Sequence, residues 1–204
     1  MEKEDYKFKV TNIKISVKLL QSVGLKFVED RCRLLQPIHR NISWKKCGNN
    51  ILTLRYNNFT YILFKKSSKL RNVASCFDRP QHCNITKIKS ESDIPEAIGH
   101  LFFLVNQTPT WLNYTIDNYS CLANTNQLID IVELYMNELT ISCDYNEQLF
   151  PALKIYCPIE ISERNLTSLV YKSGSVIFVG GNNLNEVKEF FNWVLKITQK
   201  YPKL

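Results

Sequence analysis

Alternation of apolar and polar residues is the main pattern along this chain, and it predicts β-strands. In YKFKVTNIKISVKL, residues 6–19, Val17 falls on one face and five side chains share the other, the two-residue period of a strand. The five are Phe8, Val10, Asn12, Lys14 and Ser16. NNILTLRYNNFTYILFKK, residues 49–66, predicts two strands joined at Asn57-Asn58, a turn-forming pair. HCNITKIK, residues 82–89, predicts a further strand.

The second half of the chain repeats this order of elements. The first half also contains two predicted helices, at residues 28–36 and 90–108. In the second half, strands are predicted at residues 111–124, 149–157, 167–173 and 175–181, and helices at 127–138 and 184–202. In the second helix Ser92 is the expected N-cap, with Pro95 in the first turn. Each half therefore reads β-α-β-β-β-α. We predict an α+β fold of two repeats, residues 8–108 with an insertion at about 65–82, and residues 109–204.

One face of the predicted antiparallel sheet is expected to stay uncovered, because four helices are too few to pack on both faces of about ten strands. An uncovered face is ordinarily polar. Here apolar residues alternate with the core positions, and a broad exposed apolar surface indicates a binding site. These residues are Ile62, Phe64, Leu169, Ile177 and Val179.

The charge is unevenly divided along the 204 residues, which carry a formal net charge of +7. Residues 1–102 hold 19 basic and 9 acidic residues, whereas residues 103–204 hold 7 and 10. This asymmetry favours a polyanionic partner for the first half and a separate protein partner for the second, the alternative being a solvated basic face without a ligand. The charged start and the lack of a long apolar run predict no leader and no membrane role, hence an intracellular protein that is not secreted.

The seven cysteines form no CxxC pair, which argues against a zinc ribbon and favours reduced thiols. A metal site from Cys76, Cys83 and His82 stays an open alternative. Cys121, Cys143 and Cys157 are expected to be small core residues. No nucleophile–base arrangement, phosphate-binding glycine loop or catalytic carboxylate pair is apparent, so neither an enzyme nor a cofactor is expected.

Several segments resemble the conserved core of the TATA-box-binding-protein family. LFPALKIY, residues 149–156, resembles the family's Leu-Phe-Pro-Gly-Leu-Ile-Tyr segment, and SLVYKSGSVIFVGG, residues 168–181, resembles its following hairpin. TNIKISV (11–17) and DNYSCLA (117–123) resemble the Asn-containing strands that open the two repeats. FTYILF (59–64) and IKSESD (88–93) resemble segments of its first repeat. The resemblance implies a saddle, a curved antiparallel sheet of two pseudo-symmetric repeats with helices on the convex face.

Members of this family insert apolar wedges between base steps in the minor groove of DNA. The resemblance carries this role to Phe150, Phe64 and Tyr171. In the first repeat the remaining wedge position aligns with Asn49 or Asn50, with Phe77 as a substitute if the insertion is misaligned. The groove surface would be formed by Asn12, Asn118, Ile62, Leu169, Ile177 and Val179.

Other expected contacts follow from the same resemblance. Asn12 and Asn118 match central asparagines, whose amides can donate to the acceptors that A·T pairs present in the minor groove. Phosphate contacts are expected from Lys45, Lys46, Arg55, Lys65, Lys66 and Lys69. Asn146, Glu147 and Gln148 align with the segment that binds a B-type initiation factor.

Two functions are consistent with these residues. The first is a divergent initiation factor that binds and bends A·T-rich promoter DNA and recruits a B-type factor and the RNA polymerase initiation complex. The Asn/Lys/Ile-rich composition further favours an AT-rich parasite or a large DNA virus, with a location in a nucleus, a viral replication factory or a virion. The second function is a protein-interaction scaffold that keeps the fold but has lost specific DNA binding.

Overall fold

The computed structural model describes residues 8–19, 21, 23–47, 51–64, 82–108 and 114–203. The strands are β1 (Lys9–Lys18), β2 (Ser43–Cys47), β3 (Ile51–Tyr56), β4 (Phe59–Phe64), β5 (His82–Ile88), β6 (Tyr114–Asn124), β7 (Cys143–Asp144), β8 (Ala152–Tyr156), β9 (Thr167–Tyr171) and β10 (Ser175–Gly181). The helices are α1 (Leu25–Leu35), η1 (Glu91–Asp93), α2 (Ile94–Val105), α3 (Ile131–Asn137) and α4 (Leu184–Thr198).

The strands form one sheet in the order β2-β3-β4-β5-β1-β6-β10-β9-β8-β7, and the described strand pairs are antiparallel. The fold is therefore α+β, as predicted. The chain divides into two compact units. Unit 2 is Ile13–Ile116, and unit 1 takes the chain up to Asn12 and again from Asp117 to the C-terminus. No described helix is both long and apolar enough to cross a membrane.

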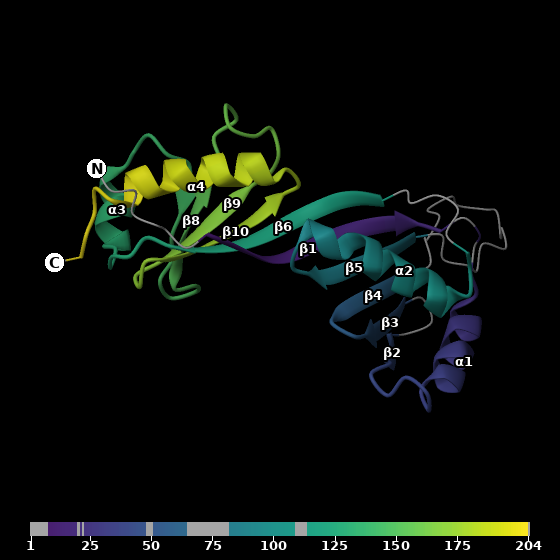
Figure 1. The fold of residues 1–204 in the computed structure, drawn as a ribbon. Helices are drawn as coiled ribbons and strands as arrows, with labels where there is room; N and C mark the ends of the chain where they lie inside the picture. Colours follow the sequence, from purple (N-terminus) through teal and green to yellow (C-terminus); the bar gives the residue numbers. More distant parts are fainter. Residues whose placement is uncertain are drawn as a thin grey trace, which may run out of the picture. The chain divides into compact units, whose positions relative to one another are not determined.

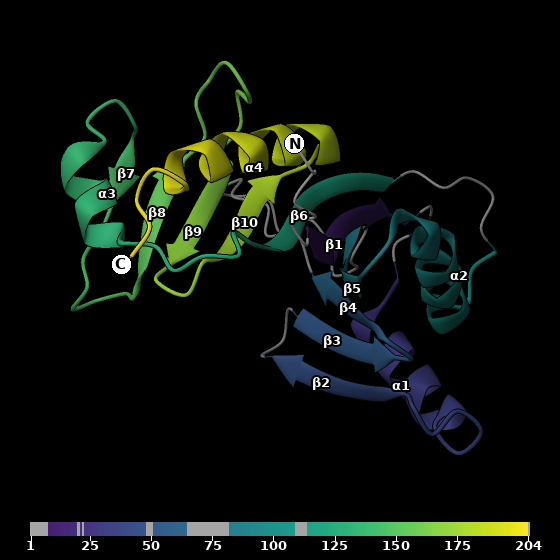
Figure 2. The same ribbon diagram turned by 60° about the vertical axis from the view of Figure 1, so that its left-hand side comes forward.

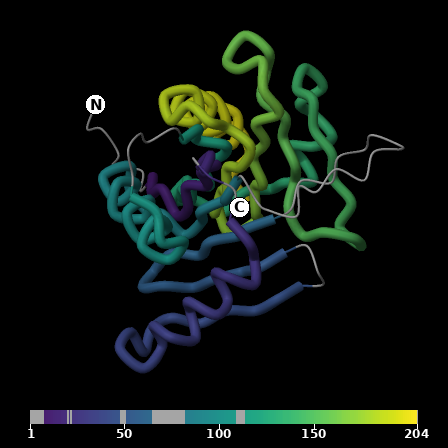
Figure 3. The backbone as a smooth tube through the Cα atoms, turned by 90° about the vertical axis from the view of Figure 1, so that its right-hand side faces the viewer, coloured from purple at the N-terminus to yellow at the C-terminus, as the bar shows by residue number. Residues whose placement is uncertain are grey.

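Unit 2 packs α1 and α2 on one face of its strands (Figures 1 and 3). Alternate residues of β3 and β4 point into this core, among them Leu52, Leu54, Tyr61 and Leu63, all at most 1% exposed. The hairpin between these strands turns at Asn57, whose positive φ of 52° suits asparagine. The intervening residues of each strand stay partly exposed and form what we call the open face of unit 2.

Unit 1 has the same arrangement, with α4 lying along β8, β9 and β10 (Figures 1 and 2). The buried stripe of α4 includes Val187, Phe190, Phe191 and Val194, whose spacing of three and four residues puts them on one side of the helix. These side chains meet core residues of the strands, and the Phe178 and Phe190 ring centroids lie 5.6 Å apart. The strand residues that alternate with the core form the open face of unit 1.

The structure differs from the sequence prediction in two local features. Both units carry a short additional edge strand, β2 and β7, where no strand was predicted. The N-cap of α2 is Asp93 rather than Ser92, and Ser90 caps the preceding η1: its side chain accepts the Ser92 N–H while Asp93 accepts the Ser90 N–H at 3.1 Å. This reciprocal capping box opens η1, which leads directly into α2.

Candidate nucleic-acid interface

The open face of unit 1 carries a continuous row of side chains across its strands. Leu169 pairs with Ile177, which pairs in turn with Leu122, 42% exposed. On the other side Leu169 pairs with Lys154. Val179, two pairs further along β10, faces the same way and pairs with Thr167. The predicted groove residues of this half therefore share one largely aliphatic surface.

Two of the predicted wedge residues meet at the end of this surface. Phe150 precedes β8 and is 42% exposed, and Tyr171 ends β9. Ala152 pairs with Tyr171, which brings the preceding Phe150 beside it. The two ring centroids lie 6.4 Å apart in an edge-to-face arrangement. Unit 1 thus presents an aromatic pair in which Phe150 is exposed and Tyr171 is partly exposed.

The corresponding end of unit 2 holds Phe64, which ends β4 and pairs with Ile51, 38% exposed. Ile62 lies two residues earlier on the same face, opposite Thr53. The predicted wedge alternatives Asn49, Asn50 and Phe77 lie outside the described residues.

The two central asparagines lie inside strands β1 and β6, where the resemblance placed them. Asn118 accepts the Gly180 N–H through Oδ1 at 2.6 Å and donates through Nδ2 to Ser120 Oγ at 3.2 Å. Because a backbone N–H can only donate, this contact identifies the amide oxygen of Asn118. Asn12 is partly exposed and shares a face with Lys14 and Ser16.

The basic residues predicted to contact phosphate divide between two faces of β2 and β3. Lys45 pairs with Thr53, and Ser43 pairs with Arg55, which puts Lys45 and Arg55 on the open face. A hollow of about 230 Å³ lies between them, lined also by Trp44. Lys46 pairs with the buried Leu52 and so belongs to the opposite side of the strand. Lys65, Lys66 and Lys69 lie outside the described residues.

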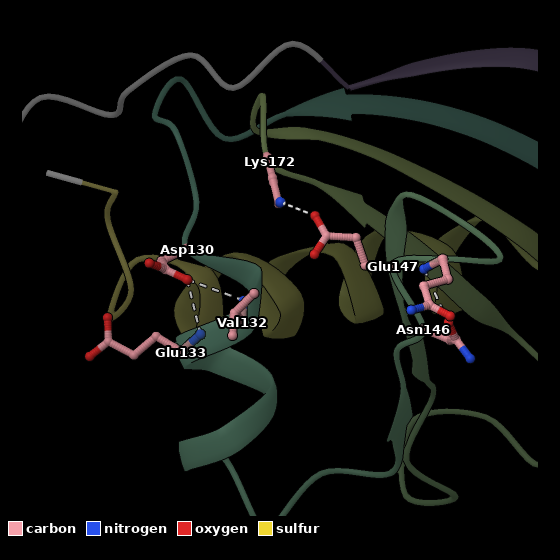
Figure 4. Close-up of polar contacts among 7 residues, drawn as sticks. Asp130, Val132, Glu133, Asn146, Glu147 and Lys172 are labelled. Carbon is pink, nitrogen blue, oxygen red and sulfur yellow. Dashed lines mark hydrogen bonds and ion pairs between the residues drawn. The ribbon is translucent and has the colours of Figure 1, made fainter.

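The segment predicted to bind a protein partner precedes β8 (Figure 4). Asn146 accepts the Gln148 N–H through Oδ1 at 3.1 Å, which shapes the turn. Glu147 is 61% exposed and pairs with Lys172 Nζ at 2.5 Å, and this hydrogen bond raises the pKa of Lys172. The one carboxylate of the segment is therefore neutralised within the chain.

To the left of this segment Figure 4 shows Asp130, which accepts the N–H groups of Val132 and Glu133. Asp130 thereby caps α3. It acts here as a structural residue.

The cysteines of the described residues do not gather into a metal site. No group of three or more His, Cys, Asp or Glu side chains among them could hold a metal ion. Cys83 is buried, whereas the adjacent His82 belongs to the open face. Burial raises the pKa of Cys121 to about 11, consistent with a core residue. Cys143 and Cys157 are only partly buried, and Cys76 lies outside the described residues.

Sequence reasoning missed several residues of this surface. Gly180, with φ 101°, sits at an irregularity in the pairing of β10 with β6 that turns its N–H to Asn118. The only signal for it was the Gly180-Gly181 doublet at a strand end. Asn84 and Leu122 also lie on the open faces. They become visible only once the strand register is known.

These features define a class of protein: an α+β sheet in two units whose uncovered faces carry apolar and amide side chains. Residues 113–201 match the family model described as transcription factor TFIID, or TATA-binding protein, TBP. Among solved structures, Methanococcus jannaschii TBP gives a TM-score of 0.70 at 16% sequence identity, covering 95% of this chain and 99% of that one. The fold is therefore that of TBP, and the second half of the chain also matches the TBP family in sequence.

Two further comparisons add little. A heterotetrameric sarcosine oxidase from Corynebacterium sp. U-96, in complex with pyrrole 2-carboxylate, gives a TM-score of 0.36 at 7% identity over 98% of this chain and 85% of that one. At this score the similarity carries no argument. No curated protein matches the chain. The TBP family is non-enzymatic, which agrees with the expectation that this protein is not an enzyme. Nothing in the comparisons supports the predicted viral source.

Proposed function

We propose that the protein is a divergent TBP-like initiation factor that binds A·T-rich duplex DNA in the minor groove and bends it. The observation that carries this proposal is the Phe150–Tyr171 pair, an exposed aromatic edge at the end of an aliphatic surface. Separating two stacked base pairs costs a few kcal/mol, which is offset by the larger protein surface that the bent duplex covers. A rigid apolar ring can fill the opened step without leaving a polar group unpaired.

The remaining surface supports the same ligand. The row of Leu169, Ile177 and Leu122 offers van der Waals contact to the walls of a groove. Asn118 provides an oriented amide whose donor nitrogen suits the acceptors of A·T pairs. Lys45 and Arg55 on the open face of unit 2 supply positive charge for phosphates.

The protein partners form part of the proposal. In this function the segment Asn146–Gln148 contacts a B-type initiation factor, which leads to the RNA polymerase initiation complex. The exposed Glu147 would exchange its bond to Lys172 for a basic group of the partner. The site of action is then intracellular, where the cell's DNA is transcribed. The repeat boundaries at residues 8–108 and 109–204 also stay a proposal.

A scaffold that has lost DNA binding is the second candidate. It is favoured by the polar character of unit 2, whose open face carries Lys14, Ser16 and Asn84 among its partly exposed side chains. Such groups are costly to bury unless the ligand satisfies them. The two candidates differ in a simple property, because duplex binding weakens linearly on a log–log scale as salt rises. A scaffold shows no duplex binding even at low salt.

The test is a fluorescence-transfer assay of bending on an A·T-rich duplex labelled at both ends. Phe150→Ala removes one ring of the aromatic edge and is expected to abolish the bend and weaken binding about tenfold or more, as loss of one aromatic–base contact does. The matched control is Leu149→Ala at the neighbouring residue, which is 82% exposed. Bending unchanged by Phe150→Ala would refute the wedge. No salt-dependent binding by the wild-type chain would favour the scaffold.

A further inference from the structure

A polar pair occupies the centre of the open face of unit 2, where unit 1 has aliphatic residues. In unit 2 Asn84 pairs with Ile62 on one side and with Ser16 on the other. In unit 1 Ile177 pairs in the same way with Leu169 and Leu122. The matching register makes Asn84 the counterpart of Ile177, and Ser16 the counterpart of Leu122. The two open faces therefore differ chemically at equivalent places.

In the structure the amide oxygen of Asn84 faces Ser16. Ser16 Oγ donates to Asn84 Oδ1 at 3.0 Å in a partly buried setting. The amide oxygen is thereby engaged, and the amide nitrogen keeps its protons available. In its two contacts, Asn84 accepts from Ser16 through Oδ1 and from Cys83 Sγ through its backbone oxygen, and Nδ2 takes part in neither. The pair thus offers a hydrogen-bond donor at the face where a ligand would lie.

Any ligand that covers this face must provide an acceptor for that donor. Asn84 is already half-buried beside Ile62, so a covering surface removes the remaining water from its NH₂ group. A buried amide without a partner is unfavourable, whereas a partnered one is not. In the minor groove, A·T and T·A pairs present only the acceptors A N3 and T O2, and a G·C pair adds the donor G N2–H₂.

We propose that Asn84 is a specificity-determining residue that donates to a base-edge acceptor and disfavours a G·C pair at the position it faces, with Ser16 as the positioning residue. This inference rests on the proposed DNA binding. The counterpart pair, Ile177 and Leu122, has no donor to satisfy and makes no such demand. The two halves then read a duplex unequally, and an asymmetric sequence is bound preferentially in one direction.

The experiment measures binding to an A·T-rich duplex in which each base pair is replaced in turn by G·C and by inosine·C, which lacks the N2 amino group. With the wild-type chain, at least one position is expected to lose about tenfold in affinity with G·C and to recover with inosine·C. Asn84→Val, which copies the aliphatic character of unit 1, should reduce the G·C penalty at one such position to less than about threefold. The other positions should keep their profile.

A second variant guards against a folding defect. Asn84→Asp keeps the shape but replaces the donor nitrogen with an acceptor oxygen, so the preference at that position should invert in favour of G·C. The ratio between duplexes is the readout, because the added charge weakens all of them equally. An unchanged ratio in both variants, with folding verified by circular dichroism, overturns the inference alone. Absence of any duplex binding by the wild-type chain overturns the proposed function instead.

Discussion

The backbone N–H of Gly180 donates to the side-chain oxygen of Asn118 at 2.6 Å, and this contact depends on an irregularity in strand pairing. Between Phe178 and Gly181 the register of β10 against β6 shifts, and Gly180 adopts φ 101°. The shift turns a ladder N–H toward a side chain. The irregularity in β10 thereby determines which amide atom of Asn118 is the oxygen.

Gly180→Ala is expected to lower the free energy of unfolding by about 2–3 kcal/mol. A residue with a Cβ is strained at this φ, and the added Cβ would lie 2.1 Å from the backbone oxygen of Asn165. The matched control is Gly99→Ala within α2, where an added Cβ meets nothing within 4 Å. That change should raise stability by about 0.5–1 kcal/mol through helix propensity. Urea unfolding of the two variants decides, and equal effects would contradict the proposed strain.

Tyr171→Phe is expected to tighten binding to A·T-rich DNA by several fold. The hydroxyl of Tyr171 must lose water if its ring inserts beside Phe150, and an unpaired hydroxyl costs about 1–3 kcal/mol. Binding can be followed by fluorescence anisotropy at fixed salt.

Tyr135→Phe on α3 is the control for Tyr171→Phe, because it removes a hydroxyl from a helix rather than from the open face. Its affinity for DNA should match that of the wild-type chain. Weaker binding by Tyr171→Phe would show that the hydroxyl finds an acceptor on the DNA.

Stability is expected to fall as the pH drops through about 6.5, because of His100. Its ring lies 4.7 Å from that of Tyr56, and Nδ1 is buried without a partner among the described residues. Burial lowers the pKa of His100, and Glu96 opposes this only in part. The unfolded chain, with a histidine pKa of about 6.5, therefore binds a proton more readily than the folded one.

The sign follows from that difference in proton binding. Above about pH 6.5 His100 is unprotonated in both the folded and the unfolded state, so no stability is lost. Below that pH the unfolded state binds a proton at His100 and is stabilised relative to the folded state. His100→Gln should flatten the change in urea midpoint between pH 7.5 and 5.5. An unchanged slope would assign the effect to another group.

Thiol labelling should separate two cysteines of unit 2. Cys47 is exposed at the end of β2, whereas Cys83 is fully buried in β5, where burial raises its pKa. A buried, protonated thiol does not react. Peptide mapping after brief alkylation at pH 8 should find Cys47 modified and Cys83 protected until urea unfolds the chain. Equal labelling under native conditions would contradict the core placement of Cys83.

The α+β fold could be predicted because alternation in β3, β4, β9 and β10 is strong and the stripe on α4 has a clear helical period. The edge strands β2 and β7 were not predicted, for two different reasons. SWKKC in β2 has mostly exposed side chains at a sheet edge and therefore no apolar alternation, and β7 has only two residues. Edge pairing is decided by a neighbouring strand rather than by the segment itself.

Single residues of the candidate site could be predicted from the sequence. Contacts between two residues that lie far apart in the sequence could not. Phe150 was predicted through the resemblance of LFPALKIY to the family's segment, and the structure shows its contact with Tyr171. The bonds of Asn118 to Gly180 and of Asn84 to Ser16 join residues 62 and 68 positions apart. No local pattern encodes such contacts, because they depend on register.

The division of the chain between its units has a consequence for biosynthesis. Unit 2 is one continuous segment, but unit 1 needs residues from both ends: Phe8 packs on Phe178 and Phe191, and Thr11 donates to the Ser120 carbonyl oxygen. During synthesis on the ribosome, the N-terminal residues therefore have no packing partners until about the last ninety residues of the chain have emerged. A shortened N-terminus will show its defect in the part of the protein that is made last.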